Sequence, residues 1–272
     1  MSSCSGNCSS CSSASSCKEK DLHLKQNEYS DIKKIYAVVS GKGGVGKSSV
    51  TALLASAMQA SGKQTAILDA DVTGPSIPKV FGISGQCETD NNVIFPRESS
   101  TGIRVMSVNL LLPQQDAPVV WRGPVISGVI QQFFTDVAWG DVDYMFVDMP
   151  PGTGDVPLTV FQSLKVDGII VVTTPQDLVG LIVSKAINMA EMMNIPIVGI
   201  VENMSYFTCP DCGKQHNIFG ESKTQQVADK FGIPVLAKLP IDVRTPALAD
   251  KGAIELADMD GVMPVIDKLL DR

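Results

Sequence analysis

The chain of 272 residues carries a formal net charge of −7 at pH 7, and 44% of its residues are hydrophobic. Its length suits one sizeable α/β core, and its acidic balance without a basic tract argues against a general nucleic-acid binder. No apolar stretch approaches the roughly 20 residues that span a bilayer, and no secretory signal is evident, so we expect a cytoplasmic protein that acts on neither nucleic acid nor membranes.

The N-terminal region differs in composition from the rest of the chain. Its first 17 residues contain nine serines and four cysteines but no charged side chain. Such a segment cannot bury enough apolar surface to fold alone. We therefore predict a disordered tail over residues 1–30 and a single folded domain over residues 31–272. Seven cysteines in a chain without a secretory signal also indicate a reducing compartment, where clustered thiols bind metal more often than they form disulfides.

A glycine-rich motif lies between an apolar strand predicted over 35–40 and a helix of small residues predicted over 49–58. Its glycines let the backbone curl so that successive N–H groups point at one phosphate chain, and the helix N-terminus adds partial positive charge. In such a motif Lys47 reaches the β- and γ-phosphates, and the Ser48 hydroxyl joins the coordination shell of Mg²⁺. The predicted nucleotide-binding residues are Gly41, Lys42, Gly43, Gly44, Val45, Gly46, Lys47, Ser48 and Ser49.

Acidic residues stand at the ends of two further predicted strands. Asp69 ends a strand over 65–69 and is followed by Asp71, and Asp148 ends a strand over 144–148. Because ligands bind at the carboxyl ends of parallel strands, we expect these carboxylates near the phosphates. Asp148 is predicted to hold Mg²⁺ directly or through water. For Asp69 and Asp71 a structural role in the turn after the strand stays open.

Strands and helices alternate over the rest of the chain. Residues 84–96 are expected to form a loop or a small hairpin. Further strands are predicted over 103–108, 168–173, 197–201 and 235–239, and further helices over 124–134, 178–193, 245–250 and 262–270. The alternation predicts an α/β fold, a single-domain P-loop NTPase whose mostly parallel twisted sheet carries helices on both faces.

A Cys-x-x-Cys pair, Cys209 and Cys212, is predicted in a loop after strand 197–201. A closed tetrahedral or cubane metal site requires four ligands, and this segment supplies two, or three if His216 is included. Two copies of the chain that meet at a two-fold axis would bring four thiolates together. A zinc site and a redox dithiol remain open as alternatives.

Four motifs occur in a fixed order and carry a resemblance to a known family. They read Lys-Gly-Gly-Val-Gly-Lys-Ser-Ser, Asp-Ala-Asp-Val-Thr-Gly-Pro-Ser-Ile-Pro, Asp-Met-Pro-Pro-Gly-Thr-Gly-Asp, and Glu-Asn-Met-Ser followed by Cys-Pro-Asp-Cys. The first resembles the deviant Walker A motif of the MinD/ParA-like P-loop ATPases. The whole set resembles the Mrp/NBP-type iron–sulfur cluster carrier ATPases, from about residue 33 to the C-terminus. The resemblance implies a homodimer that hydrolyses ATP, takes a [4Fe-4S] cluster from scaffold or donor proteins, holds it between subunits and transfers it to apoproteins.

The resemblance also implies roles for single residues. Lys42 would reach across the dimer to the partner's nucleotide, and Asp71 would orient the attacking water. Asp69 would support Mg²⁺ through water or orient the phosphate loop, and Asn203 would contact the adenine. Cys209 and Cys212 would bridge the cluster between subunits.

The tail cysteines resemble the family only in part. Cys8, Cys11 and Cys17 have the spacing found at the end of the cluster-binding arm in NBP-type members. Those members place another cysteine much further upstream, whereas Cys4 lies three residues before Cys8. A second iron–sulfur site and a disordered tail that binds metal transiently both stay open.

Two other classes of function remain as alternatives. A MinD/ParA-like positioning ATPase would have a basic amphipathic C-terminal helix, but Lys268 and Arg272 are the basic residues of 262–272 and lie among aspartates. A P-loop kinase or ligase would need a substrate pocket that the sequence does not reveal. A zinc-binding P-loop ATPase is the remaining variant of the favoured interpretation.

Overall fold

The computed structural model describes residues 23–72, 74–112, 123–152, 154–176 and 179–271. Residues 1–22 of the tail predicted over 1–30, with Cys8, Cys11 and Cys17, lie outside the described residues. Residues 23–29 already contact the domain: the Leu24 amide donates to the Ser163 carbonyl at 2.7 Å, and the Asn27 side chain donates to the Thr135 and Val137 carbonyls. Where the tail ends and the domain begins stays a prediction.

The centre of the fold is a nine-stranded sheet with the strand order β10-β9-β8-β1-β7-β2-β6-β5, in which β11 also pairs with β9. The pairs β1–β7, β1–β8, β2–β6, β2–β7, β8–β9 and β9–β11 are parallel, and the pairs β9–β10 and β5–β6 are antiparallel. The strands are β1 (Ser30–Ser40), β2 (Thr65–Asp69), β5 (Arg97–Glu98), β6 (Arg104–Met106), β7 (Gly140–Asp148), β8 (Gly168–Thr173), β9 (Ile197–Thr208), β10 (Gln215–His216) and β11 (Val235–Pro240). A separate hairpin pairs β3 (Thr89–Asp90) with β4 (Val93–Ile94), within the segment expected to be a loop or hairpin.

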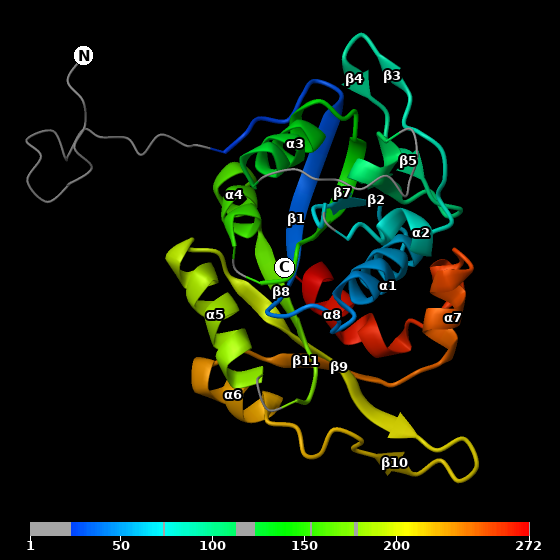
Figure 1. Cartoon of the computed structure of the whole chain (residues 1–272), viewed down its shortest axis with the longest axis vertical. Helices are drawn as coiled ribbons and strands as arrows, with labels where there is room; N and C mark the ends of the chain where they lie inside the picture. Colours follow the sequence, from blue (N-terminus) through cyan, green and yellow to red (C-terminus); the bar gives the residue numbers. More distant parts are fainter. Residues whose placement is uncertain (1–22, 73, 113–122, 153, 177–178, 272) are drawn as a thin grey trace, which may run out of the picture.

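Helices cover both faces of the sheet (Figure 1). One buried apolar cluster lies under α3 (Gly123–Thr135), α4 (Asp155–Ser163), α5 (Val179–Met192) and α6 (Thr224–Phe231). The other lies under α1 (Lys47–Ala60), α2 (Ile77–Val80), α7 (Arg244–Asp250) and α8 (Met263–Leu270). Successive β1 residues alternate between them, with Ala37 and Val39 in the first cluster and Tyr36 and Val38 in the second. Both faces of β1 are therefore buried, which explains its nearly continuous apolar run.

The predicted α/β fold with a mostly parallel sheet is confirmed, and β2 and β8 have the predicted bounds. The prediction of a loop after residue 201 is wrong, because β9 continues to Thr208 alongside β11 and then β10. Helix α6 was not predicted. Strand β6 is shorter than the predicted 103–108, because residues 108–110 turn into a 3-10 helix. None of the described helices is both long and apolar enough to cross a membrane.

Strand β1 lies between β8 and β7, and the chain order changes direction around it. In open parallel sheets such a point leaves a crevice at the carboxyl ends of the strands. Ser40, Asp69 and Asp148 end β1, β2 and β7, and Asp69 pairs with Asp148 in the parallel register of β2 and β7. The glycine-rich motif and both acidic motifs therefore meet at one edge of the sheet.

Candidate functional site

The glycine-rich loop has the backbone geometry that its sequence predicts. Gly44 and Gly46 have φ angles of 78° and 79°, in the left-handed region that glycine adopts without steric cost. Gly46 is also closely approached, because a Cβ built on it would lie 2.3 Å from Nδ2 of Asn203. Helix α1 begins at Lys47, so its N-terminus and partial positive charge face the loop. This geometry suits a phosphate chain.

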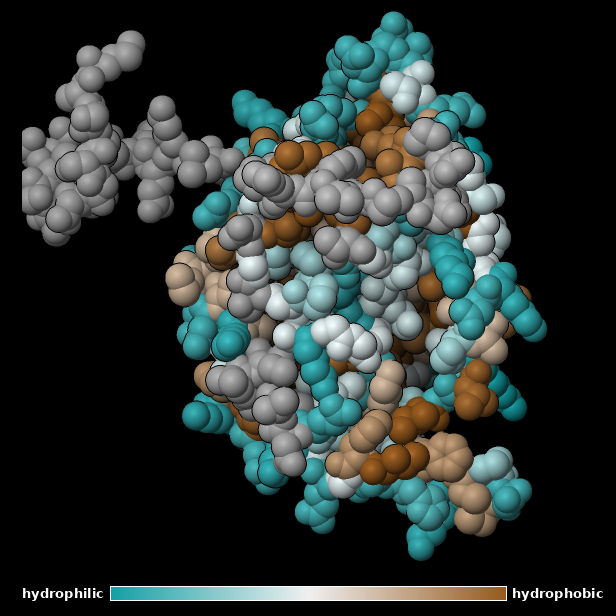
Figure 2. Space-filling model, viewed as in Figure 1, coloured by the Kyte–Doolittle hydropathy of each residue, from teal (hydrophilic) through white to brown (hydrophobic). Residues whose placement is uncertain are grey.

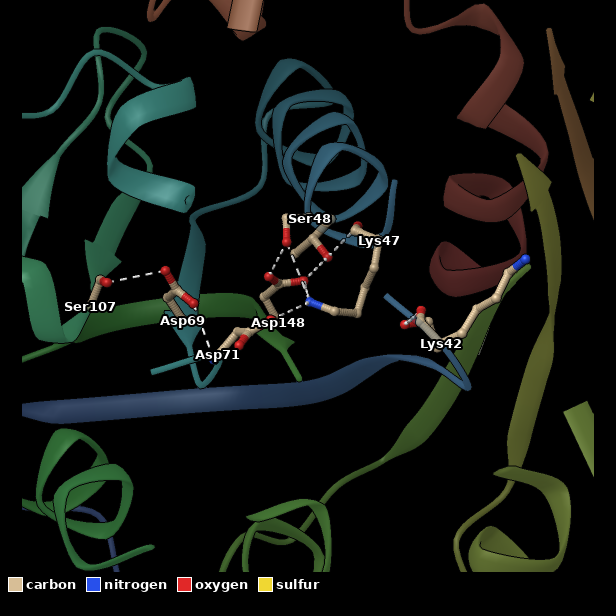
Figure 3. A network of polar contacts seen from close by, with 9 residues as sticks. Lys42, Lys47, Ser48, Asp69, Asp71, Ser107 and Asp148 are labelled. Carbon is tan, nitrogen blue, oxygen red and sulfur yellow. Dashed lines mark hydrogen bonds and ion pairs between the residues drawn. The ribbon is translucent and has the colours of Figure 1, made fainter. Parts of the chain in front are cut away.

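Lys47 and Ser48 both contact Asp148, which is completely buried (Figure 3). The Lys47 ammonium lies 2.7 Å from Oδ1 of Asp148, and the Ser48 hydroxyl donates to Oδ2 at 2.6 Å. The Thr51 hydroxyl donates to Oδ1 at 2.7 Å. We did not predict Thr51, although it lies one helical turn after Lys47 and so shares the face of α1 that Lys47 occupies.

The remaining two carboxylates flank this network. Asp69 is fully buried and accepts hydrogen bonds from the Ser107 hydroxyl at 3.1 Å and from the Asp71 amide at 3.2 Å. The Asp71 carboxylate lies 4.0 Å from the Lys47 ammonium. Burial and the neighbouring Asp148 raise the pKa of Asp69 to about 8. Ser107 was not predicted, because it reaches Asp69 only through the pairing of β6 with β2.

The chemistry of this edge suits a divalent cation beside phosphates. The raised pKa of Asp69 keeps this group mostly protonated at neutral pH, so the carboxylates of Asp71 and Asp148 face the ammonium of Lys47 and leave an excess of negative charge among these side chains. The Ser48 hydroxyl adds a neutral oxygen donor. Hard oxygen donors of this kind are what Mg²⁺ prefers, and it is usually shared with nucleotide phosphates. The donor set therefore fits Mg²⁺.

Lys42 does not join this network. In Figure 3 its side chain points away from Lys47 and Asp148. Its ammonium donates instead to the side-chain oxygen of Gln176, which follows β8. Within one subunit Lys42 is thus separated from the phosphate site, which leaves a contact with a second nucleotide as its predicted role.

Asn203 lies against the phosphate loop. Its side-chain amide donates to the Val45 carbonyl at 2.9 Å, while its side-chain oxygen accepts from the Met204 amide at 3.0 Å. Met204 has a φ of 55°, which is uncommon for a residue with an unbranched apolar side chain. These contacts show that Asn203 supports the loop backbone. Its contact with adenine stays a prediction.

The cysteine pair forms a tight turn directly after β9. The Cys209 amide donates to the Lys214 carbonyl and the Gly213 amide to the Cys209 carbonyl, both at 2.9 Å, and Gly213 has a φ of 69°. Cys212 is exposed and Cys209 partly exposed, and both are free thiols. Among the described residues no three histidine, cysteine or acidic side chains form a metal-binding group, so His216 does not complete a site in one chain. The turn leaves both thiols at least partly exposed at the surface.

Backbone N–H groups change the acidity of one of these thiols. The amides of Cys212 and Asp211 donate to the Cys209 sulfur and, with the Cys212 side chain, lower the pKa of the Cys209 thiol below its usual value. The thiolate is the form that binds metal and attacks electrophiles. Cys87 differs, because burial raises the pKa of its thiol to about 11.

This difference predicts how the two thiols react with iodoacetamide. A lowered pKa gives Cys209 a larger thiolate fraction at neutral pH, whereas Cys87 stays protonated until the pH approaches 11. We expect Cys209 to be alkylated roughly tenfold faster or more at neutral pH, with the gap narrowing as the pH rises. Peptide mass spectrometry of the reduced, metal-free protein over a pH series measures both rates. A Cys209 pH midpoint at or above that of an ordinary thiol would contradict the prediction.

Comparisons with known proteins agree with the motifs. The ParA family model, described as NUBPL iron-transfer P-loop NTPase, matches residues 31–269. The chain is 45% identical over 261 residues to an iron-sulfur cluster carrier protein of Methanocaldococcus jannaschii, which covers 93% of this chain and 90% of that protein. An iron-sulfur cluster carrier protein of Clostridium perfringens is 40% identical over 256 residues, 91% of this chain and 90% of that protein.

Solved structures show the same relationship. The nucleotide-binding protein of Archaeoglobus fulgidus, determined in complex with ADP, is 45% identical and superposes with a TM-score of 0.75 over 84% of this chain and 89% of that chain. A MinC:MinD complex of Aquifex aeolicus matches with a TM-score of 0.64 at 16% identity, over 88% of this chain and 96% of that chain, and supports the fold alone. The resemblance inferred from the four motifs is thus confirmed, and the chain belongs to the ParA family of NUBPL-type iron-transfer P-loop NTPases.

Proposed function

We propose that this protein is an ATP-hydrolysing carrier of a [4Fe-4S] cluster, which a homodimer holds and transfers to iron–sulfur apoproteins in the cytoplasm. One observation carries the proposal. The strand β9 bears Asn203, which contacts the phosphate loop, and leads directly into the exposed turn of Cys209 and Cys212. The nucleotide site and a pair of metal-binding thiols therefore belong to one structural unit. The names of the relatives support iron–sulfur clusters as the cargo.

The phosphate site divides its tasks among a few side chains. Lys47 would place its charge on the β- and γ-phosphates, and the loop amides would hold the phosphate chain. Ser48 and Asp148 would hold Mg²⁺, with Asp69 supporting it through water, and the ion would supply positive charge beside the phosphates. Asp71 lies at the rim of this network, 14% exposed, where a carboxylate can orient a water toward the γ-phosphate. Lys42 would serve the nucleotide of the partner subunit.

The cysteine turn calls for a second copy of the chain. A cubane cluster needs four thiolate ligands, and this segment of one subunit offers two. Two turns related by a two-fold axis supply all four. Ile218 and Phe219, which follow β10, are 58% and 41% exposed, and Figure 2 shows apolar residues near this hairpin. Exposed apolar side chains of this kind are typical of surfaces that bind another protein. A cluster held between exposed turns is accessible to donor proteins and to recipient apoproteins.

Metal analysis of the protein purified without oxygen tests the proposal. We expect iron and acid-labile sulfide in equal amounts, a dimer in solution, and loss of the cluster to an apoprotein or chelator. Cysteines in the tail can add iron of their own, so the shared site is counted as the difference between the wild type and a variant lacking Cys209 and Cys212. Zinc without sulfide at these two cysteines would contradict the proposal and favour the zinc-binding alternative.

A further inference from the structure

Glu202 closes the base of the segment that carries the two cysteines. Its side chain is completely buried. The Ser205 hydroxyl donates to Oε1 of Glu202 at 2.5 Å, and the Ser222 hydroxyl donates to Oε2. Ser205 lies on β9 before the cysteine turn, whereas Ser222 lies after β10, where the chain returns to the body of the protein. One carboxylate therefore holds both ends of the segment that contains Cys209 and Cys212.

The next residue along the strand contacts the nucleotide site. Asn203 donates to the Val45 carbonyl, and its amide occupies the space that a side chain on Gly46 would need. Glu202 and Asn203 therefore have different partners, since Glu202 accepts from Ser205 and Ser222 whereas Asn203 contacts the phosphate loop. The methyl carbon of Met204 lies 3.9 Å from the point that a Cβ on Gly46 would occupy. Two adjacent residues thus attach β9 to the cysteine segment on one side and to the phosphate loop on the other.

The backbone directly after these two residues is unusual. Met204 adopts a φ of 55°, a conformation that costs energy for such a residue and persists only where its surroundings enforce it. The Met204 side chain lies near the phosphate loop, and its backbone continues along β9 toward the cysteine turn. Figure 1 shows the end of β9 extending, with β10, away from the body of the sheet. A change in the conformation of the phosphate loop can therefore alter the backbone that leads to the cysteine turn.

We propose that Glu202 is a positioning residue that couples the nucleotide site to the cysteine turn. It does so by keeping both ends of the cysteine segment attached to the stretch of β9 that contacts the phosphate loop. The inference rests on the proposed function, in which nucleotide and cluster act in one cycle. A phosphate chain in the loop shifts Asn203, and the Glu202 carboxylate passes the shift to Cys209 and Cys212 through Ser205 and Ser222. Coupling between binding sites is reciprocal, so a ligand on the cysteines also changes the affinity for nucleotide.

The test measures thiol reactivity in the reduced, metal-free protein, with and without ADP. In the wild type we expect ADP to change the alkylation rate of Cys209 by about fivefold, near the lower end of typical coupling factors. Ser222→Ala removes the hydrogen bond that Ser222 donates to Glu202, and Ser222 lies outside the nucleotide site. In this variant we expect the ratio of rates with and without ADP to fall to about one, while the Kd for ADP stays within about twofold. Ser222→Thr keeps a hydroxyl and is expected to restore the ratio. Cys87 serves as the internal reference, because it lies outside the proposed connection from Asn203 through Glu202 to the cysteine turn.

Two results would overturn the inference. One is a wild-type ratio of one, and the other is a Ser222→Ala ratio equal to that of the wild type. If Ser222→Ala fails to fold, hydrogen exchange of the wild-type chain decides, since amides in residues 205–222 must change their exchange rate when ADP binds. Unchanged exchange there refutes the coupling. None of these measurements uses iron, so they can refute the coupling while the cluster assignment holds. The metal analysis can likewise refute the cluster assignment while the coupling holds.

Discussion

Replacing Lys47 and replacing Asp71 are expected to damage ATP turnover in different ways. Lys47→Ala removes a charged hydrogen-bond donor from the phosphates, an interaction worth about 1.5–3 kcal/mol, so nucleotide affinity should fall roughly 10- to 100-fold and turnover with it. Asp71→Asn keeps the shape of the side chain but removes the carboxylate that would orient water. We expect ATP to bind with nearly wild-type affinity while hydrolysis falls roughly 100-fold or more. Calorimetric binding and phosphate release separate the two effects.

The controls follow from the surroundings of these residues. Lys47 is 6% exposed and neutralises the buried Asp148, so its loss leaves a buried charge without its partner and lowers stability by about 3–5 kcal/mol. Thermal unfolding must therefore accompany the binding measurement. Lys47→Arg keeps a positive charge beside Asp148 and should fold, although a planar guanidinium cannot replace the compact ammonium at the phosphates. Asp141→Asn is the matched control for Asp71→Asn. Asp141 is exposed and lies near the start of β7, at the end opposite Asp148. Wild-type hydrolysis by Asp71→Asn would show that another group orients the water.

Replacing Cys209 or Cys212 with serine is expected to remove the shared cluster completely. Each substitution removes one thiolate from each of the two subunits. A site with four ligands therefore keeps two, which is too few for a closed cubane. We expect about four irons and four sulfides fewer per dimer than in the wild type, and no transfer from this site to an apoprotein. ATP binding should be largely retained, because neither cysteine contacts the phosphate loop in the described structure. Iron and sulfide analysis, together with absorption spectra under anaerobic conditions, measures the loss.

Cys87→Ser is the matched control for these variants. Its sulfur lies 3.7 Å from the Met106 sulfur, and burial raises the pKa of its thiol to about 11, so it is a poor metal ligand. The Cys87→Ser variant should therefore keep the wild-type iron and sulfide content. A cluster that survives the combined loss of Cys209 and Cys212 would place the cargo elsewhere, and the tail cysteines would then be the first candidates.

Short segments with strong local patterns were predicted well. The apolar runs of β2 and β8 were placed with the bounds that the structure has, since both strands are buried along their whole length. The glycine-rich motif over residues 41–48 was recognisable because its glycines, lysines and hydroxyl occur at fixed spacing between a strand and a helix. Segments without such patterns were missed. Helix α6 has a low apolar content and is stabilised by its contacts with α5 and β11.

The amino-acid sequence alone determined the fold class, the phosphate loop and the cysteine turn, because each depends on residues that are neighbours along the chain. The tertiary structure decided how these parts are connected. The pairing of Asp69 with Asp148 comes from the register of β2 and β7, and the contact of Asn203 with Val45 joins residues 158 positions apart. The attachment of Ser222 to Glu202 likewise appears only when the chain has returned from β10. Such contacts depend on packing between segments that are distant in the sequence, so local residue patterns do not predict them.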